Sequence, residues 1–180
     1  MRNTKLSCHP QNLDSNSATL NWSPPPPDLF KINYDGVVFE EASRSGIGVV
    51  IRNNQGLVIA SLTQKLPQAY QAIEIEPMAA IQALESGLEV GIDQAIVEGD
   101  SEIVVKNLVS NNLSLASFGL LIEDACTYAA SFSKLSYSKT KREYNKVAHN
   151  LIKLVVFVWI ENVPPYVYRI FNLIWLLCKV

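Results

Sequence analysis

The chain has 180 residues, a length that fits one compact domain with short extensions and is too short for two full domains. Hydrophobic residues make up 48% of the chain and charged residues 18%, which excludes disorder for most of it. The 15 Lys and Arg against 17 Asp and Glu give a formal net charge of -2. A nucleic-acid partner would therefore have to be bound by a local basic patch rather than by the whole surface.

The cysteines and the first residues indicate where the protein works. Cys8, Cys126 and Cys178 are odd in number and widely spaced, so they favour neither a disulfide framework nor a zinc site, and they fit a reducing compartment. Residues 1–10 are polar and lack the apolar core of a secretory signal. We therefore expect an intracellular protein, nuclear or cytoplasmic, that is not secreted.

Three parts are expected along the chain. Residues 1–28 are rich in Asn, Ser and Pro and end in a run of prolines, which predicts a flexible leader. Residues 29–160 form the folded domain, and residues 161–180 form an apolar C-terminal extension. The stretch 151–180 is apolar, yet charged residues and prolines divide it into pieces shorter than the ~20 residues that span a bilayer. We expect no membrane partner, and a surface there that is buried or faces a protein partner.

The folded domain is expected to begin with a three-stranded antiparallel meander. Residues 30–34, 46–51 and 57–62 are rich in β-branched and aromatic side chains, which is typical of strands. Residues 52–56 supply the turn between the last two.

Helices and strands then alternate. From Pro77 the apolar period changes from 2 to 3.6, which predicts a helix with Pro77 in its first turn and Gly91 as its stop. The further predicted elements are a strand at 95–97, a helix to about residue 109, a linker at 110–117, a helix at 118–130, a strand at 134–140 and a helix from 145 to about 159. The core side of this last helix is predicted to hold Val147, Leu151, Leu154 and Val158. The order βββαβααβα indicates an α/β domain with parallel additions to the meander.

Acidic residues are concentrated between Lys65 and Lys106, a stretch with eight Asp and Glu and no Lys or Arg. Such a run is usually a solvated helix face. Three acids stand apart by position: Asp35 ends a strand, Glu76 stands at the mouth of a helix, and Asp100 follows the strand at 95–97. Singly, each has an ordinary role as a turn or capping residue. Together, their carboxylates can meet at one rim of a sheet and bind Mg²⁺ there.

Five fragments occur in order along the chain: residues 32–36 (INYDG), residues 46–50 (GIGVV), Glu76 with Ala79, Ala83 and Leu84, residues 98–101 (EGDS) and residues 142–149 (REYNKVAH). The set resembles the ribonuclease H family and, more narrowly, plant reverse-transcriptase-like ribonuclease H domains. The resemblance runs from about residue 24 to residue 165, with 41 positions from Asp35 to Glu76 and 24 from Glu76 to Asp100.

This resemblance implies a ribonuclease H-like α/β fold, in which helices flank a five-stranded mixed sheet. It also implies a nucleic-acid-binding endonuclease that hydrolyses the RNA strand of RNA–DNA hybrids with two Mg²⁺ ions, Mn²⁺ being a substitute. By this analogy Asp35, Glu76 and Asp100 hold the metal and, with His149, form the catalytic set.

Three departures from the family pattern stand out. His149 occupies the position of the fourth acid, although histidine there resembles the plant-type branch, and imidazole is a poor Mg²⁺ ligand. Its alternative role is that of a residue on a polar helix face with Asn145 and Lys153. Lys139 stands where many relatives carry a mobile histidine. The linker at 110–117 has no basic or aromatic residue with which to grip a hybrid.

A basic segment at residues 134–146 has five Lys and Arg against Glu143, a local charge of +4. It is either a solvated strand edge or a phosphate-binding patch next to the metal site. The expected nucleic-acid contacts are Gly36, Lys139, Lys141, Arg142 and Asn145. Two functions stay open: a Mg²⁺-dependent ribonuclease H-type nuclease, and a weakly active or inactive domain that binds nucleic acid or protein.

Overall fold

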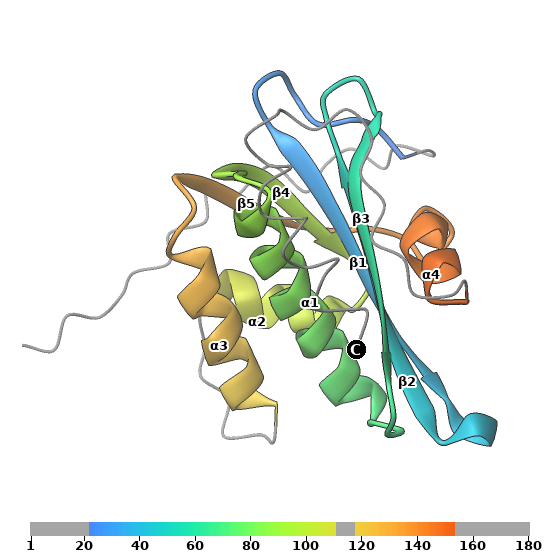
Figure 1. The fold of residues 1–180 in the computed structure, drawn as a ribbon. Helices are drawn as coiled ribbons and strands as arrows, with labels where there is room; N and C mark the ends of the chain where they lie inside the picture. The colour runs from blue at the N-terminus through green and yellow to red at the C-terminus, as the bar shows by residue number, and fades with distance from the viewer. Residues whose placement is uncertain (1–21, 111–117, 154–180) are drawn as a thin grey trace, which may run out of the picture.

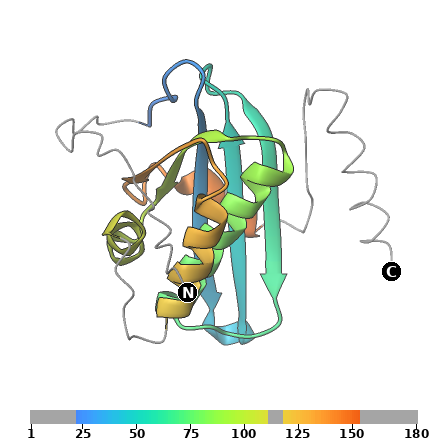
Figure 2. The same ribbon diagram turned by 90° about the vertical axis from the view of Figure 1, so that its left-hand side faces the viewer.

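The computed structural model describes residues 22–110 and 118–153, which form a mixed five-stranded sheet with helices on both sides (Figures 1 and 2). The strands are β1 (Phe30–Phe39), β2 (Arg44–Arg52), β3 (Val58–Leu66), β4 (Gln94–Gly99) and β5 (Lys134–Lys139). The helices are α1 (Ala72–Glu89), α2 (Glu102–Ser110), α3 (Gly119–Ala129) and α4 (Lys146–Lys153), with a 3-10 turn at Glu40–Ala42. The predicted order βββαβααβα is confirmed.

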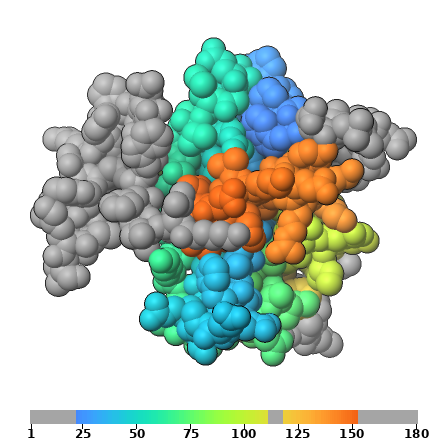
Figure 3. Space-filling model, turned by 90° about the vertical axis from the view of Figure 1, so that its right-hand side faces the viewer, coloured from blue at the N-terminus to red at the C-terminus, as the bar shows by residue number. Residues whose placement is uncertain are grey.

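The sheet has the strand order β3-β2-β1-β4-β5. Strands β1, β2 and β3 pair antiparallel as the expected meander, while β4 pairs parallel to β1 and β5 parallel to β4. Helices α1, α2 and α3 cover one face and α4 lies on the other (Figures 1 and 3). The main core lies between α1 and the sheet, where Ile32, Tyr34, Ile75, Leu84 and Val97 are fully buried. No described helix is long and apolar enough to cross a membrane.

Strand β1 continues past the predicted end at Tyr34, so the placement of Asp35 at a strand end was wrong. The pairing of β1 with β2 runs on without a break to Phe39 and Arg44. The parallel pairing with β4, in contrast, runs only from Phe30 to Asn33. Asp35 therefore lies in the middle of β1, yet beyond the last residue that β4 pairs with.

Helix α1 begins at Ala72, so Pro77 lies inside the helix and Glu76 is not at its mouth, contrary to prediction. The Glu74 carboxylate accepts a hydrogen bond from the Gln71 N–H at 2.9 Å, which caps the first turn. Ile75, in this earlier part of the helix, is fully buried. Capping and burial thus outweigh the one backbone hydrogen bond that proline cannot donate.

Helix α4 has a different register from the one predicted. Ala148 and Ile152 are its buried residues, whereas Val147 is 45% exposed. A Cβ on Gly48 would overlap the Ala148 carbonyl, so α4 rests directly on the backbone of β2. The predicted core stripe through Val147 was wrong because the spacing of apolar residues in α4 does not show which face of the helix packs on the glycines of β2. Leu154 and Val158 lie outside the described residues.

Residues 22–28, which the sequence placed in the leader, pack on the sheet. The Trp22 ring lies 4.7 Å from Arg52 and 5.3 Å from the Lys31 ammonium. The same ammonium donates to the Ser23 carbonyl at 2.7 Å and pairs with Glu98 at 3.0 Å. These residues therefore belong to the folded part of the chain. Residues 1–21, residues 111–117 of the predicted linker and the predicted extension at 161–180 lie outside the described residues.

Candidate metal centre

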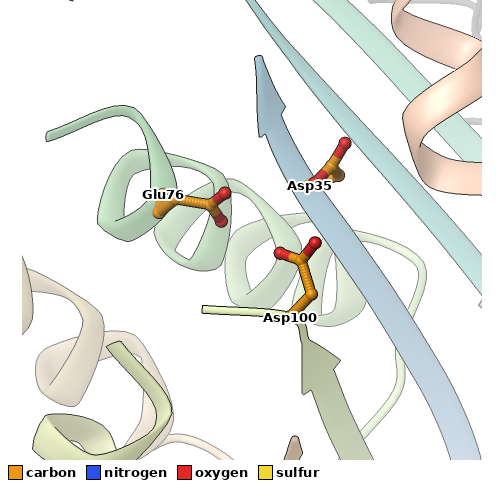
Figure 4. Close-up of side chains that lie close together, drawn as sticks. All are labelled: Asp35, Glu76 and Asp100. Atoms are coloured by element: carbon orange, nitrogen blue, oxygen red, sulfur yellow. The ribbon is translucent and has the colours of Figure 1, made fainter. Parts of the chain in front are cut away.

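The three carboxylates singled out in the sequence meet at one rim of the sheet (Figure 4). Asp35 comes from the middle of β1, Glu76 from the second turn of α1, and Asp100 from the turn after β4. Because β4 ends at Gly99, Asp100 leaves the sheet beside the stretch of β1 that β4 no longer pairs with. One oxygen of each carboxylate lies within 4.8 Å of the others.

Close packing brings α1 to this rim. A Cβ on Gly36 would lie 2.8 Å from the Ile75 carbonyl oxygen, nearer than van der Waals contact allows. Gly36, predicted to contact nucleic acid, has a role in helix packing here, since only glycine lets α1 approach β1 this closely. Glu76 follows Ile75 and is carried to Asp35 by the same approach.

Burial and mutual repulsion disfavour ionisation of these acids. Asp35 is 3% exposed, and Glu76 and Asp100 are half-buried. Burial, followed by the negative charges of Asp100 and Asp35, raises the pKa of Glu76 to about 9. Burial also raises the pKa of Asp35 above its ordinary value, against the opposing effect of its hydrogen bond with His149. All three members of the cluster are acids, so no member offsets the negative charge of the others.

A divalent cation fits this cluster. The Glu76 Oε2 atom is buried and has no hydrogen-bond partner among the described residues. Carboxylate oxygens are the ligands that Mg²⁺ and Mn²⁺ prefer, and a bound cation would offset the repulsion that raises the pKa of Glu76. The residues that would hold it are Asp35, Glu76 and Asp100, as the sequence predicts.

His149 lies at the cluster rather than on a polar face away from it. Its Nδ1 atom is 2.7 Å from Asp35 Oδ2, and its side chain is 21% exposed. Asn145, one helical turn earlier, is 1% exposed and donates to the Tyr34 carbonyl at 2.7 Å. Asn145 therefore anchors the start of α4 on β1 and does not reach the surface, which removes it from the expected nucleic-acid contacts.

The basic residues before α4 differ in their interactions with acidic groups. Arg142 is exposed, and its positive charge lowers the pKa values of both Asp35 and Glu76. Lys141 is exposed beside it. Lys139 instead pairs with Glu102 at 2.5 Å on the surface. Of the predicted basic contacts, Arg142 is the one with an electrostatic link to the carboxylates.

Sequence reasoning missed Tyr34, which lies next to Asp35 in the chain and is fully buried. Its hydroxyl has no partner among the described residues. A tyrosine in an alternating strand looks like an ordinary core residue, so the available signal was only its position beside a predicted metal ligand.

Comparisons with known proteins identify a family and a set of structures with a similar fold. The chain matches the family described as reverse transcriptase-like over residues 33–155, which is more than half of its length. A comparison with curated proteins gives no significant match.

Several solved structures share the fold. RNase H1 from the halophilic archaeon Halobacterium salinarum NRC-1 is 22% identical, with a TM-score of 0.63 over 68% of this chain and 93% of that one. The N-terminal RNase H domain of a Mycobacterium tuberculosis protein is 24% identical, with a TM-score of 0.62 over 68% of this chain and 89% of that one. LC11-RNase H1, solved in complex with an RNA/DNA hybrid, is 22% identical, with a TM-score of 0.62 over 69% of this chain and 94% of that one. With the RNase H fold and the family match together, the chain belongs to the reverse transcriptase-like family of RNase H domains.

Proposed function

We propose that the protein is a metal-dependent endonuclease that hydrolyses the RNA strand of RNA–DNA hybrids. The observation that carries this proposal is the meeting of Asp35, Glu76 and Asp100 within 4.8 Å on an RNase H fold. The hybrid bound to the structurally similar LC11-RNase H1 supports the choice of substrate.

In this proposal the three carboxylates would hold two Mg²⁺ ions, or Mn²⁺ in their place. The ions would supply Lewis-acid activation of a water and stabilisation of the leaving 3′ oxygen, so no protein nucleophile would be needed. The chain's own contribution is to place its oxygens. β1 fixes Asp35, α1 fixes Glu76, and the His149 ring holds the Asp35 carboxylate through the contact of 2.7 Å.

Substrate binding is assigned to the basic residues before α4. Arg142 and Lys141 are exposed, and Arg142 acts electrostatically on the carboxylate cluster, so a phosphate at the metal centre would lie within its reach. Selection of a hybrid would depend on 2′-hydroxyl contacts to the RNA strand and on the shape of the duplex rather than on base edges.

A second function has one observation in its favour. His149 occupies one oxygen of Asp35 and stands where the family pattern has a fourth acid, so it supplies no hard oxygen ligand. A domain that binds nucleic acid without cleaving it would have this feature.

One assay separates the two functions. The purified chain is incubated with end-labelled RNA–DNA hybrid, double-stranded RNA and double-stranded DNA of one sequence, with Mg²⁺, with Mn²⁺ and with a chelator. The nuclease proposal expects metal-dependent cleavage of the RNA strand of the hybrid alone. Hybrid binding without cleavage in either metal would favour the binding module.

A further inference from the structure

Tyr34 lies beneath the metal centre, on the opposite side of β1 from Asp35. Successive side chains of a strand point to opposite faces, so Tyr34 enters the core under α1 while its neighbour faces α4. The tyrosine is 0% exposed, and its hydroxyl has no hydrogen-bond partner among the described residues. A buried hydroxyl without a partner destabilises a fold, so the atom calls for an explanation.

The end of β4 leaves room for this ring. A Cβ on Gly99 would overlap the Tyr34 ring and its hydroxyl oxygen, so only glycine fits above the tyrosine. Gly99 directly precedes Asp100, and the hydroxyl therefore lies under the turn that carries this carboxylate. Burial, with the charges of Glu76 and Asp100, raises the pKa of Tyr34 far above its ordinary value. The hydroxyl consequently keeps its hydrogen and can donate it.

Glu76 offers an acceptor that acts electrostatically on this hydroxyl. Glu76 Oε2 is buried and also has no partner among the described residues. Of the carboxylates, Glu76 has the largest electrostatic effect on Tyr34. The metal-free structure thus leaves both a donor under Gly99 and an acceptor on Glu76 without a partner among the described residues.

We propose that Tyr34 is a positioning residue of the metal centre: when Mg²⁺ is bound, its hydroxyl donates a hydrogen bond through one water to the Glu76 carboxylate and so orients it. The proposal rests on the metal site of the proposed function. Hydrogen bonds from outer residues commonly orient carboxylates that bind metals. The alternative is that Tyr34 only fills space beneath Gly99, in which case its oxygen contributes nothing to metal binding.

Removing that oxygen alone distinguishes the two roles. Tyr34→Phe keeps the ring. Ser86→Ala is its matched control, because the buried Ser86 hydroxyl also has no partner in the described part of the chain but lies ten positions after Glu76 in α1. Mg²⁺ affinity is measured by calorimetry, and the melting temperature is measured in chelator and in Mg²⁺.

We expect Tyr34→Phe to melt in chelator at the same temperature as the wild type or higher, because it loses an unsatisfied polar group. Its Mg²⁺ affinity should fall roughly tenfold, with a smaller gain in melting temperature on adding Mg²⁺. Ser86→Ala should retain wild-type affinity. In a Glu76→Gln background, Tyr34→Phe should cause no further loss of affinity.

Unchanged Mg²⁺ affinity in Tyr34→Phe would overturn the proposal, and so would an equal loss of affinity in Ser86→Ala. Wild-type protein that binds neither Mg²⁺ nor Mn²⁺ would overturn both this role and the metal site. If Tyr34→Phe weakens binding but the wild type cleaves no hybrid, the positioning role stands and the proposed nuclease function fails.

Discussion

His149 on α4 and Asp35 on β1 are 114 positions apart in the chain, and their side chains meet at 2.7 Å between Nδ1 and Oδ2. When Asp35 is ionised its carboxylate only accepts hydrogen bonds, so Nδ1 of His149 is then the donor in this contact. The contact holds one oxygen of a metal ligand in place. It also puts a nitrogen-bearing side chain where the sequence resemblance leads us to expect an oxygen ligand.

Replacing this imidazole by a carboxylate should favour Mg²⁺. We expect His149→Asp to raise the Mg²⁺-supported rate of hybrid cleavage by roughly tenfold, with a smaller change in Mn²⁺, which accepts nitrogen ligands better. Parallel rate measurements in the two metals test this expectation. His149→Asn is the control, since it has a similar size and no charge. Equal Mg²⁺ rates in the two variants would show that this position does not contact the metal.

The metal-free protein should lose stability as the pH rises. The pKa of Glu76 is about 9 in the folded protein and about 4.5 in the unfolded chain, so between these values the folded state binds more protons. The free energy of unfolding should therefore fall with rising pH, by up to about 1.4 kcal/mol per pH unit for one proton. Asp35 adds to this fall over a narrower range above its ordinary pKa, because its pKa is raised as well.

Urea unfolding in chelator from pH 5 to pH 9 measures this slope. Glu76→Gln should flatten it, since the amide does not titrate, and saturating Mg²⁺ should flatten it in the wild type. A slope that Glu76→Gln leaves unchanged would show that burial and the neighbouring carboxylates do not raise the pKa of Glu76 in the folded protein.

The position of Asp100 was predictable because it depends on a local rule. A buried strand followed by Gly99, Asp100 and Ser101 predicts a parallel strand whose carboxyl end carries an acid. Asp35 and Glu76, chosen by spacing and resemblance, do meet Asp100 in the structure, but they reach it from positions other than those predicted. Asp35 lies within β1 rather than at its end, and Glu76 lies in the second turn of α1.

What the sequence did not predict depends on contacts between distant elements. The register of α4 is decided by the close approach of Ala148 to Gly48 on β2, which no apolar period in α4 alone reveals. The fit of Tyr34 beneath Gly99 likewise joins β1 to β4. The packing of residues 22–28 on the sheet was also not predicted. It depends on Trp22, whose ring packs on cationic side chains of β1 and β2.

Seating of α4 on β2 should control the position of His149. Gly48→Ala places a methyl group against the Ala148 carbonyl, so α4 must move away from the sheet. We expect a loss of about 1–3 kcal/mol in the free energy of unfolding. The distance between His149 and Asp35 should increase, which a shift of the His149 ring resonances in NMR spectra would report. Wild-type stability together with unshifted resonances would contradict this seating of α4.

Hybrid binding should depend on the basic residues near the carboxylates. Lys141→Glu combined with Arg142→Glu should weaken binding and lower the logarithmic salt slope by about two, since each phosphate contact contributes roughly one unit. Binding titrations at several salt concentrations measure the slope. Lys134→Glu is the control, because Lys134 is exposed at the opposite end of β5 from Lys139. If both proteins keep the wild-type slope, the basic residues are solvated surface only.

The most direct test of the metal centre is RNA-strand cleavage of a labelled hybrid by wild-type protein and by Asp100→Asn, at equal concentration in Mg²⁺. Asp100→Asn removes one carboxylate from the cluster, and in chelator it should fold at least as stably as the wild type, because its charge no longer repels Glu76. We predict cleavage by the wild type that chelator abolishes, and none by Asp100→Asn. Equal cleavage by the two proteins, or cleavage by the wild type that persists in chelator, would contradict the account.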